Sequence, residues 1–580
     1  NFAAGQTAAA QFNRRRTDKR KTGRKTHQPA GERGGQTMHR KRKWEQGRAS
    51  RQVQFLTAED RETGGKACWD QLEIVGNVKI FPPGLCCMTY LRYLYMSHNK
   101  ISVIPSQISQ LKNLVHLDLS FNMIKILPPE IGELTELKEL YLQNNQIRAL
   151  PMQIGRLFQL TTLNLNHNPL SPDISQLYNA ETTQNMLSWF LDSEGFAMPP
   201  PPSRNWRYLR NPNDTSDGMA FTLMCYNVLC EGYATKKQYP YCPSWALQWE
   251  YRRRGIMDEI RVYQADILCL QEVETEQFSV FFKPELAKSG YDGIFSAKSR
   301  AKTMSASESK YVDGVAIFWK KERFNLIKED VIEFSRMAVE RYEKDCKDNH
   351  EMINRVMVKD NIALMAIFEV KDEVSAQSRQ LVVSTAHIHW DPEYSDVKVI
   401  QSIMLLSALW KKIEDHMLQQ RPGVESVDVT SMPLIICGDF NSLPESGVFE
   451  YLATGKINKS HPDFKELGYE NILDKLTPHR SQHHPELLEH DLNLVRCYDQ
   501  EVGMRYTNYT YDFRGVIDYI FFTGAHFSNI GCLDMIPETW FTEHNILGCP
   551  HPHISSDHFS LLVELELKPE QQQQRDLVRK

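Results

Sequence analysis

The stretch Pro433-Leu-Ile-Ile-Cys-Gly-Asp-Phe-Asn-Ser442 joins a short apolar run to two polar residues, Asp439 and Asn441. An apolar run bounded by proline and glycine predicts a buried β-strand. A rigid strand can present the side chains that follow it to a ligand at the edge of a sheet. The stretch therefore predicts a strand of an α/β domain that ends in a functional carboxylate and a functional amide.

Similar segments recur from residue 218 to about residue 566, and helical stretches separate them. The apolar or alternating segments predict strands at 221–228, 267–273, 314–319, 364–370, 381–388, 434–437, 516–522 and 559–566. Apolar residues at helical spacing predict helices at 249–263 and 397–419. Strands that alternate with helices indicate one α/β domain of catalytic size.

Polar residues recur at or near the ends of several predicted strands in this domain. They are Asn227, Glu272, His387, Asp439 with Asn441, Asp518, and Asp557 with His558. Phosphodiester hydrolysis needs an activated water and stabilisation of charge on the phosphate oxygens. Carboxylate oxygens are the ligands that Mg²⁺ prefers, and the sequence has no Cys/His cluster of the kind that binds zinc. The set therefore suits magnesium-assisted hydrolysis better than zinc chemistry.

A repeat of 23 residues precedes this domain and is marked by Asn99, Asn122, Asn145 and Asn168. Each asparagine closes a Leu-x-x-Leu-x-Leu pattern, with Met96 in place of one leucine, and an apolar residue follows two positions later. This is the leucine-rich-repeat signature, in which short parallel strands stack and a buried asparagine binds turn backbone. We expect about five repeats, counting a degenerate first one at 69–77. The predicted strand face is polar and aromatic enough to dock a protein partner: Tyr93, Tyr95, His116, Asp118, Glu139 and Tyr141.

Charge is distributed unevenly along the 580 residues, whose net charge is −5. The first 51 residues carry a charge of +12 and the remainder −17. Few large apolar residues occur near the N-terminus, so we predict a basic disordered tail at 1–65. We then predict leucine-rich repeats at 66–178, a helix and proline-rich linker at 179–217, the catalytic domain at 218–566 and a disordered tail at 567–580. No apolar run is long enough to span a membrane, which excludes an integral membrane protein of helical type.

Two further segments carry weaker signals. The stretch 298–310 is rich in Ser, Ala and Lys, and we expect a mobile loop near the substrate entrance. The histidines His479, His483, His484 and His490 lie in or just after a polar stretch, where a solvated loop is favoured over a metal site.

The six polar segments, taken in this order and at these separations, resemble the exonuclease/endonuclease/phosphatase superfamily of DNase I-like hydrolases. The repeats in front, together with the segments 386–398 and 511–520, resemble more narrowly the carbon catabolite repressor protein 4 family. This family contains the repeat-bearing deadenylases of the carbon-catabolite-repressor/NOT complex. The resemblance implies a leucine-rich-repeat solenoid followed by a DNase I-like four-layer α/β sandwich.

The resemblance also implies roles for individual residues. Asp439, aided by Asn441, would orient or deprotonate the attacking water. His558 would contact the scissile phosphate in a tautomer fixed by Asp518, and His387 would be a further phosphate contact. The implied metal ligands are Glu272, Asp439, Asp557 and Asn227, and they would hold Mg²⁺, as two ions. The implied substrate contacts are Glu272, His387, Asn441, Pro392 and Phe513, where Phe513 stacks on a base and Pro392 packs against it.

The implied activity is 3′-to-5′ shortening of poly(A) tails with release of 5′-AMP. The implied partners are the 3′ end of poly(A) RNA and an RNase D-like deadenylase subunit that binds the repeats and links the chain to the NOT scaffold, with no membrane partner. The implied location is the cytoplasm, with the nucleus left open as a second compartment. Two alternatives remain: a phosphomonoesterase or abasic-site endonuclease with the same catalytic residues, and an inactive leucine-rich-repeat adaptor.

Overall fold

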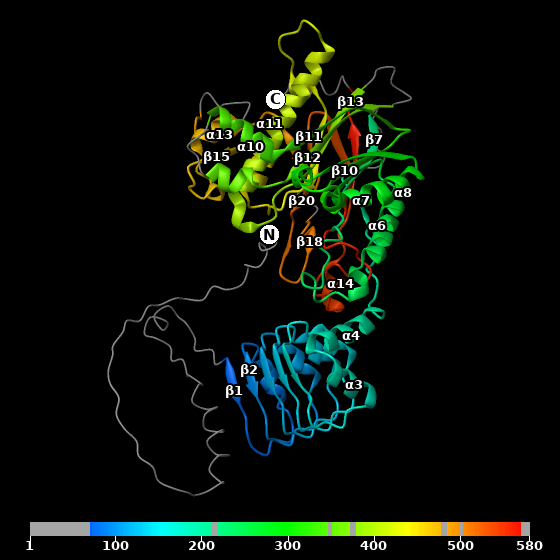
Figure 1. Ribbon diagram of the computed structural model, residues 1–580, viewed down its shortest axis with the longest axis vertical. Coiled ribbons are helices and arrows are strands. Elements are labelled where there is room, and N and C mark those ends of the chain that lie inside the picture. Colours follow the sequence, from blue (N-terminus) through cyan, green and yellow to red (C-terminus); the bar gives the residue numbers. More distant parts are fainter. Residues whose placement is uncertain are drawn as a thin grey trace, which may run out of the picture. The chain divides into compact units, whose positions relative to one another are not determined.

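The computed structural model describes residues 70–210, 218–345, 351–371, 379–476, 484–498 and 503–569 (Figure 1). The predicted tail at 1–65 lies outside these residues, as does most of the one predicted at 567–580. Within the described residues, no helix combines the length and the apolar character that a membrane span needs.

The repeats form a sheet of five parallel strands in chain order. The strands are β1 (Gln71–Glu73), β2 (Tyr93–Tyr95), β3 (His116–Asp118), β4 (Glu139–Tyr141) and β5 (Thr162–Asn164). Each turn of the solenoid is completed by a 3-10 helix: η1 (Pro83–Cys87), η2 (Ser106–Gln110), η3 (Pro129–Glu133) or η4 (Met152–Arg156). The central leucines of β2 to β5 are buried in one shared core, as the repeat pattern predicts.

The repeated asparagines bind backbone groups between neighbouring turns of the solenoid. The side-chain oxygen of Asn122 accepts from the Ile101 N–H at 3.0 Å, and its amide donates to the carbonyls of Met96 and Leu119 at 2.9 and 3.0 Å. Asn145 makes the equivalent bonds one repeat later. Since the turns leave backbone groups unpaired inside the solenoid, each buried amide satisfies several of them. The predicted role of these asparagines is confirmed.

Two helices follow the last repeat: α3 (Pro172–Ala180) and α4 (Thr183–Gly195). The side chain of Thr182 accepts from the Asn185 N–H at 3.2 Å and caps α4, which places Met186, Leu187 and Phe190 in the repeat core. The helix predicted around Met186 is therefore present, and it covers the open end of the repeat core.

The rest of the described chain contains two large sheets. The seven-stranded sheet has the order β6 (Trp206–Tyr208), β21 (Phe527–Leu533), β22 (Leu561–Leu567), β7 (Met219–Asn227), β8 (Ile267–Glu274), β10 (Asp313–Lys320) and β9 (Tyr291–Ala297). The six-stranded sheet has the order β11 (Phe324–Glu333), β12 (Ile362–Val370), β13 (Arg379–His387), β14 (Leu434–Asp439), β20 (Asp518–Thr523) and β17 (Leu494–Arg496). Every predicted strand is present within two residues of its expected ends.

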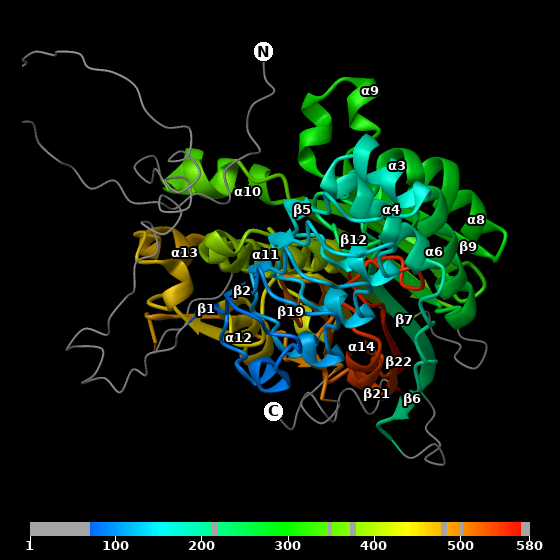
Figure 2. The same ribbon diagram turned by 90° about the horizontal axis from the view of Figure 1, so that it is seen from below.

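The helices cover the outer faces of the two sheets (Figures 1 and 2). One side carries α5 (Ser244–Leu247), α6 (Trp249–Tyr263), α7 (Thr275–Gln277) and α8 (Lys283–Ala287), and the other carries α10 (Phe334–Asp345), α11 (Ser395–Gln420), α12 (Gly447–Thr454) and α13 (Glu470–Leu476). One hydrophobic cluster packs α6 against β7, β8 and β10. A second cluster fills the space between the two sheets. A third cluster packs α11 against β12, β13 and β14. These layers confirm the predicted four-layer α/β sandwich.

Smaller elements complete the described chain. They are η5 (Phe278–Phe282), η6 (Ser299–Thr303), α9 (Ala306–Ser309), η7 (Met352–Met357), η8 (Pro392–Tyr394), η9 (Val429–Ser431), β15 (Lys456–Asn458), η10 (Pro462–Phe464), β16 (Leu487–Glu489), β18 (Asn508–Tyr509), β19 (Arg514–Gly515) and α14 (Glu538–Glu543).

Candidate active site

Four strand ends bring the predicted polar residues together. Asn227 ends β7, which runs parallel to β8, and Glu272 lies near the end of β8. His387 ends β13 and Asp439 ends the parallel strand β14, where the two residues are paired in register. Parallel strands end at the same edge of a sheet, so one edge of each sheet carries a polar pair.

Asp518 reaches the same place from an antiparallel strand. It begins β20, and its backbone is paired in register with Asp439. Gly438, just before Asp439, has φ of 145°, and a Cβ there would lie 2.0 Å from the carbonyl oxygen of Ala386. The glycine of the Gly-Asp-Phe-Asn motif therefore permits the close approach of β14 to β13.

Asn227 joins the carboxylates of the two sheets. Its buried amide donates to Glu272 Oε1 at 3.1 Å and to Asp439 Oδ2 at 3.0 Å. Its side-chain oxygen accepts from the Leu229 N–H at 3.0 Å, which fixes the orientation of the amide. One neutral side chain thus holds two acidic groups within reach of a common ligand.

Glu272 is held in an uncommon backbone conformation at this junction. Its φ is 58°, in the left-handed region that non-glycine residues seldom occupy. Its second carboxylate oxygen accepts from the Cys230 N–H at 3.1 Å. Burial, with the nearby carboxylate of Asp313, raises the pKa of Glu272. A strained residue with an electrostatically disfavoured charge points to a site where a ligand supplies compensation.

Asp439 lies at the centre of the cluster. Its Oδ1 accepts from the Asn441 N–H at 2.9 Å, and its Oδ2 lies 3.7 Å from Nε2 of both His387 and His558. Burial and the neighbouring carboxylate of Asp518 raise the pKa of Asp439 to about 7, although His558 opposes the shift. A carboxylate with this pKa can exchange a proton near neutral pH.

The pKa values of the two histidines beside Asp439 are shifted in opposite directions. His558 Nδ1 lies 2.8 Å from Asp518 Oδ2, and the Asp518 and Asp439 charges raise its pKa well above the ordinary value despite burial. Burial, with the cation of Lys298, lowers the pKa of His387. The carboxylate partner of His558 matches the predicted pairing, in which Asp518 fixes the ring orientation.

The remaining predicted catalytic residues lie around this cluster. Asp557 is buried, and its Oδ2 accepts from the Tyr239 hydroxyl at 2.9 Å and from the Asn508 amide at 3.1 Å. Asn441 has φ of 48°, and its amide donates to the Ile388 carbonyl at 3.0 Å. The Asn441 carbonyl in turn accepts from Lys398 Nζ at 2.7 Å.

The two predicted base contacts lie outside this hydrogen-bonded cluster. Pro392 begins η8 and is exposed. Phe513 lies in the turn between β18 and β19 with 38% of its surface exposed. An aromatic ring that is this exposed has a face available to stack on a ligand. The base-contact roles of Phe513 and Pro392 stay predictions.

A cationic pair beside Glu272 was missed by the sequence analysis. Lys298 is buried with its Nζ 2.7 Å from Asp313 Oδ2, and Arg300 lies 2.7 Å from Asp313 Oδ1. These cations hold the pKa of Asp313 well below its usual range, and the carboxylate raises the pKa of Lys298. The interpretation of 298–310 as a mobile loop is wrong at its start, because Lys298 is fixed in the site. Asp313 is the first residue of an apolar strand, and this position is the signal by which the sequence could have identified Asp313.

The histidine-rich stretch also differs from its interpretation. His490 is buried and its Nε2 lies 2.9 Å from the Tyr451 carbonyl, so it is a packed core histidine rather than part of a solvated loop. His484 is exposed, and His479 and His483 lie outside the described residues.

The donor set fits a hard divalent cation. The carboxylate oxygens of Asp439 and Asp518 and a ring nitrogen of His558 lie within 4.8 Å of one another. In the described residues, Asp518 Oδ1 and His387 Nδ1 are buried without a hydrogen-bond partner. Buried polar atoms rarely lack partners, and uncompensated carboxylate oxygens are the groups that Mg²⁺-like cations bind.

Comparisons with known proteins agree with this architecture. Residues 224–558 match the family model described as the Endonuclease/Exonuclease/phosphatase family, and residues 78–179 match a leucine-rich repeat region. The CCR4-NOT transcription complex subunit 6-like-B of Xenopus laevis is 50% identical over 526 residues, which cover 89% of this chain and 94% of the relative. The CCR4-Not complex 3′-5′-exoribonuclease subunit Ccr4 of Schizosaccharomyces pombe is 36% identical over 407 residues, which cover 64% of this chain and 56% of the relative.

Among solved structures, the 2′,3′-cyclic phosphatase ANGEL2 is 24% identical with a TM-score of 0.48, and the match covers 63% of this chain and 99% of that one.

Proposed function

The chain belongs to the endonuclease/exonuclease/phosphatase family and, within it, to the repeat-bearing carbon catabolite repressor protein 4 family, and from this premise we propose its reaction. It is a metal-dependent 3′-to-5′ exoribonuclease that shortens the poly(A) tails of messenger RNA and releases 5′-AMP. The relatives named as 3′-5′ exoribonucleases support this assignment. The observation that carries it is the cluster in which Asn227 joins Glu272 to Asp439 beside the Asp518–His558 pair.

The cluster has the parts that hydrolysis of a terminal phosphodiester needs. Asp439 orients the attacking water and takes its proton, because its buried carboxylate lies at the centre of the cluster, within 3.7 Å of both His387 and His558. His558, held protonated by Asp518 and Asp439, faces the developing negative charge on the phosphate oxygens. The water oxygen bonds to phosphorus as the bond to the preceding 3′ oxygen breaks. The water proton goes to Asp439, and the leaving 3′ oxygen takes up a proton from solvent.

Other residues bind the substrate. Asn441 and His387 contact the scissile phosphate, and Asn227 keeps Glu272 and Asp439 in place. Glu272, Asp439, Asn227 and Asp557 are the proposed ligands of two Mg²⁺ ions. When bound, the ions neutralise phosphate charge and lower the pKa of water. Phe513 stacks on a terminal base and Pro392 packs against it, which suits any base because every base has a π-face.

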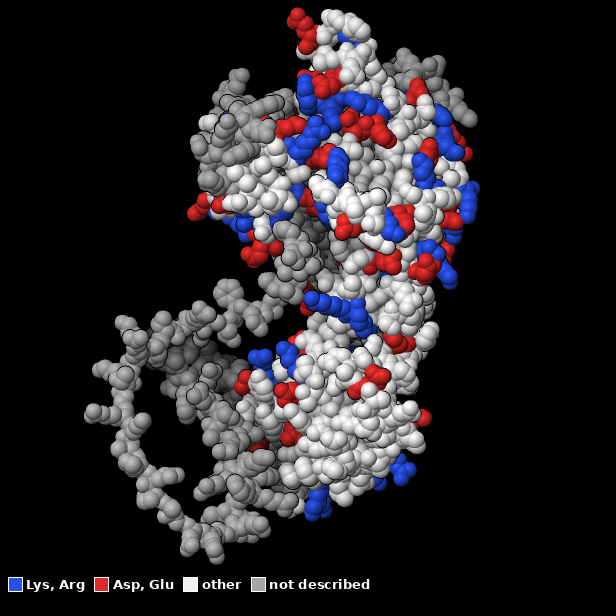
Figure 3. Space-filling model, in the orientation of Figure 1, with Lys and Arg blue, Asp and Glu red and all other residues white. Residues whose placement is uncertain are grey.

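The charge distribution favours a short contact with RNA. Figure 3 shows Lys and Arg side chains scattered among Asp and Glu side chains on the visible face of the two-sheet region. Proteins that follow a long nucleic-acid backbone carry a continuous basic track. The enzyme therefore binds only a few nucleotides at the 3′ end. Additional affinity for RNA comes from the basic N-terminal residues or from partners.

The strand face of the repeats is the proposed partner site. The His116 ring lies 4.6 Å from the Tyr95 ring and 5.2 Å from the Tyr141 ring, and its Nδ1 is 3.0 Å from Glu139. Such an aromatic and polar face suits a protein interface. We assign it to an RNase D-like deadenylase subunit that links the chain to the NOT scaffold, and we propose the cytoplasm as the location of the assembly, with the nucleus left open as a second compartment.

The experiment uses the purified chain and 5′-labelled RNA ending in A20, U20 or C20, in Mg²⁺ or EDTA. We expect a ladder that shortens from the 3′ end, runs fastest on A20, disappears in EDTA and is absent in Asp439→Ala. The matched control is Asp415→Ala, which removes an exposed carboxylate of α11. Phosphate release from small phosphoesters without RNA cleavage would overturn the proposal in favour of a phosphomonoesterase. Cleavage at an internal abasic site would indicate an endonuclease, and inertness towards all substrates would indicate an adaptor.

A further inference from the structure

The hairpin formed by β18 and β19 connects the catalytic carboxylates to the proposed base contact. At its base, the Thr507 hydroxyl donates to Asp518 Oδ2 at 2.6 Å and the Asn508 amide donates to Asp557 Oδ2 at 3.1 Å. At its tip, the turn carries Phe513, whose carbonyl accepts from the Thr510 N–H at 2.7 Å. A shift of this hairpin would therefore move both ends of the substrate site.

The tip of this hairpin contacts the leucine-rich repeats through Tyr511. The Tyr511 hydroxyl donates to Glu136 and accepts from the Gln159 amide at 3.2 Å. Its ring makes a T-shaped contact with the ring of Phe158, with centroids 4.9 Å apart and an interplanar angle of 88°. Burial, with the Glu136 hydrogen bond, raises the pKa of Tyr511, so the hydroxyl keeps its proton as a donor.

The repeat side of this contact is built from equivalent positions. Glu136 and Gln159 are 23 residues apart, so they occupy the same place in two successive repeats. The Gln159 amide also donates to Glu136 Oε1 at 3.2 Å, which holds the acceptor in place. A hydrogen bond to a carboxylate is stronger than one between neutral groups. The solenoid thus offers a preformed receptor for one tyrosine hydroxyl.

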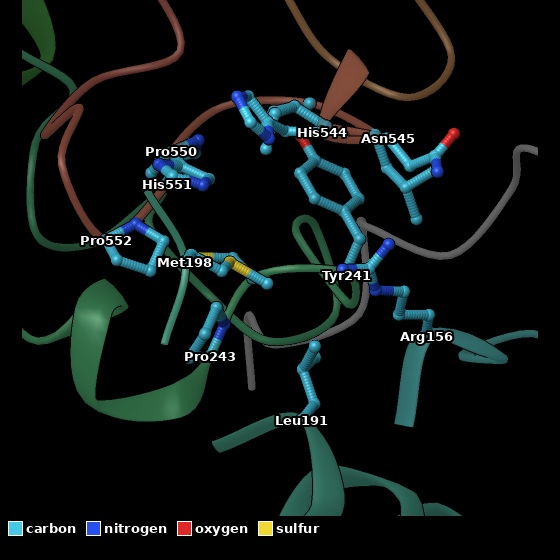
Figure 4. A pocket seen from close by; sticks show the side chains of 14 residues that line it. Arg156, Leu191, Met198, Tyr241, Pro243, His544, Asn545, Pro550, His551 and Pro552 are labelled. Carbon is cyan, nitrogen blue, oxygen red and sulfur yellow. The ribbon is translucent and has the colours of Figure 1, made fainter. Parts of the chain in front are cut away.

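The opposite side of Tyr511 is closely packed as well. The ring centroids of Tyr241 and Tyr511 are 6.4 Å apart. The Tyr241 hydroxyl donates to the Cys549 carbonyl at 2.6 Å. A Cβ on Gly548 would lie 2.7 Å from the Tyr241 ring and 2.8 Å from the Tyr511 nitrogen, so only glycine fits. Figure 4 shows Tyr241 in the adjoining pocket, with Arg156 of η4 on one side and His544 on the other. The tip therefore has little freedom to move.

We propose that the repeats are part of the support of the substrate site, with Tyr511 as a positioning residue that Glu136 and Gln159 anchor. The anchor holds the hairpin so that Phe513 is ready to stack on the 3′-terminal base. The proposal rests on the proposed exoribonuclease function for its kinetic consequence. It assigns the repeats a role in catalysis by the same chain, in addition to partner binding.

The test uses the full chain with Tyr511→Phe, which removes only the hydroxyl. We expect KM for A-tailed RNA to rise about three- to tenfold, as for one or two net hydrogen bonds, with kcat nearly unchanged. RNA whose terminal nucleotides are abasic has no base to stack, so the rise should nearly vanish on it. Glu136→Ala should give the same rise, and the double variant should add little, because the two residues act as one unit.

The matched control is Tyr291→Phe, which removes a buried hydroxyl that donates to the Ala265 carbonyl at 2.5 Å, on β9 and away from the hairpin. It should leave KM unchanged. An unchanged KM in Tyr511→Phe, or equal changes with base-bearing and abasic RNA, would overturn the proposal.

Hydrogen exchange separates this proposal from the proposed function. In Tyr511→Phe, peptides covering 503–515 should exchange faster than in the parent, while peptides from β12 and β13 should not. Inactivity of the parent on every RNA would defeat the proposed function only, whereas unchanged exchange at the hairpin would defeat the positioning role.

Discussion

Buried asparagines are used differently in the repeats and in the two-sheet region. Asn122 and Asn145 bind only backbone groups of their own and adjacent turns, and both of their side-chain ends are satisfied. Asn227 instead donates to two carboxylates that come from different sheets. The same side chain therefore stabilises the fold in one region and holds mutually repelling charges together in the other. Buried polar groups that are fully paired serve stability, and those left poorly compensated indicate function.

The strongest test of this contrast is Asp439→Asn. We expect kcat to fall about 10³-fold or more, because the proposed acceptor of the water proton is removed. The folded-state pKa of Asp439 is raised, so its contribution to stability is full at acidic pH and is lost as pH rises towards 7. In EDTA at pH 7.5 the variant should therefore melt at the same temperature as the parent or higher. Loss of activity together with a large fall in Tm would contradict the contrast.

In the repeats we expect the opposite result from Asn145→Ala. The change leaves the Ile124 N–H without its partner, while the carbonyls of Leu119 and Leu142 each lose one of their two amide donors and keep the bond from Asn122 or Asn168. One buried unpaired N–H of this kind reduces the free energy of unfolding by about 1 to 3 kcal/mol. Chemical denaturation measures this loss, while kcat per folded molecule should stay within twofold of the parent. Asn166→Ala, at an exposed side chain in the last repeat, is the control.

Low pH should destabilise the two-sheet region more than the repeats. Burial lowers the pKa of His490 and His526 to about 4 and that of His551 to about 3. As pH falls from 6.5 towards 4, the unfolded chain binds protons that the folded chain does not. Each histidine then lowers stability by about 1.4 kcal/mol per pH unit.

The repeat histidines, His98, His116 and His167, are exposed or half-buried. Hydrogen exchange at pH 5 should therefore show the two-sheet region losing protection first. Earlier loss in the repeats would contradict this expectation.

The last of these tests is Phe513→Ala, which changes RNA binding and leaves the fold intact. Stacking on a single-stranded base contributes roughly 1 to 3 kcal/mol, so KM should rise about five- to a hundredfold with little change in Tm. The rise should be similar for A, U and C tails, because stacking does not read base identity. Phe513→Tyr keeps the stacking face and should retain most of the affinity. An unchanged KM in Phe513→Ala would contradict the proposed stacking of Phe513 on a base.

Local patterns account for much of what could be predicted. The repeats bury residues against neighbours 23 positions away, so a periodic pattern contains nearly all of the contacts. The large strands were predicted because buried strands are continuously apolar, and Asp439 was found because a polar pair ends such a run. Lys298 was missed because its partner Asp313 comes from a different segment, and a lysine in a Ser/Ala-rich stretch has the composition of a solvated loop.

By itself, the sequence determined the solenoid, the four-layer fold, the family and most of the residues of the candidate site, since each depends on local spacing or on a motif. Only the tertiary structure showed that Asn227 joins the two sheets, that Lys298 lies beside the carboxylates of the candidate site, and that Tyr511 binds Glu136 some 375 residues away. These contacts depend on how separate segments pack. Packing depends on the shapes of whole layers and leaves no periodic signal in the chain.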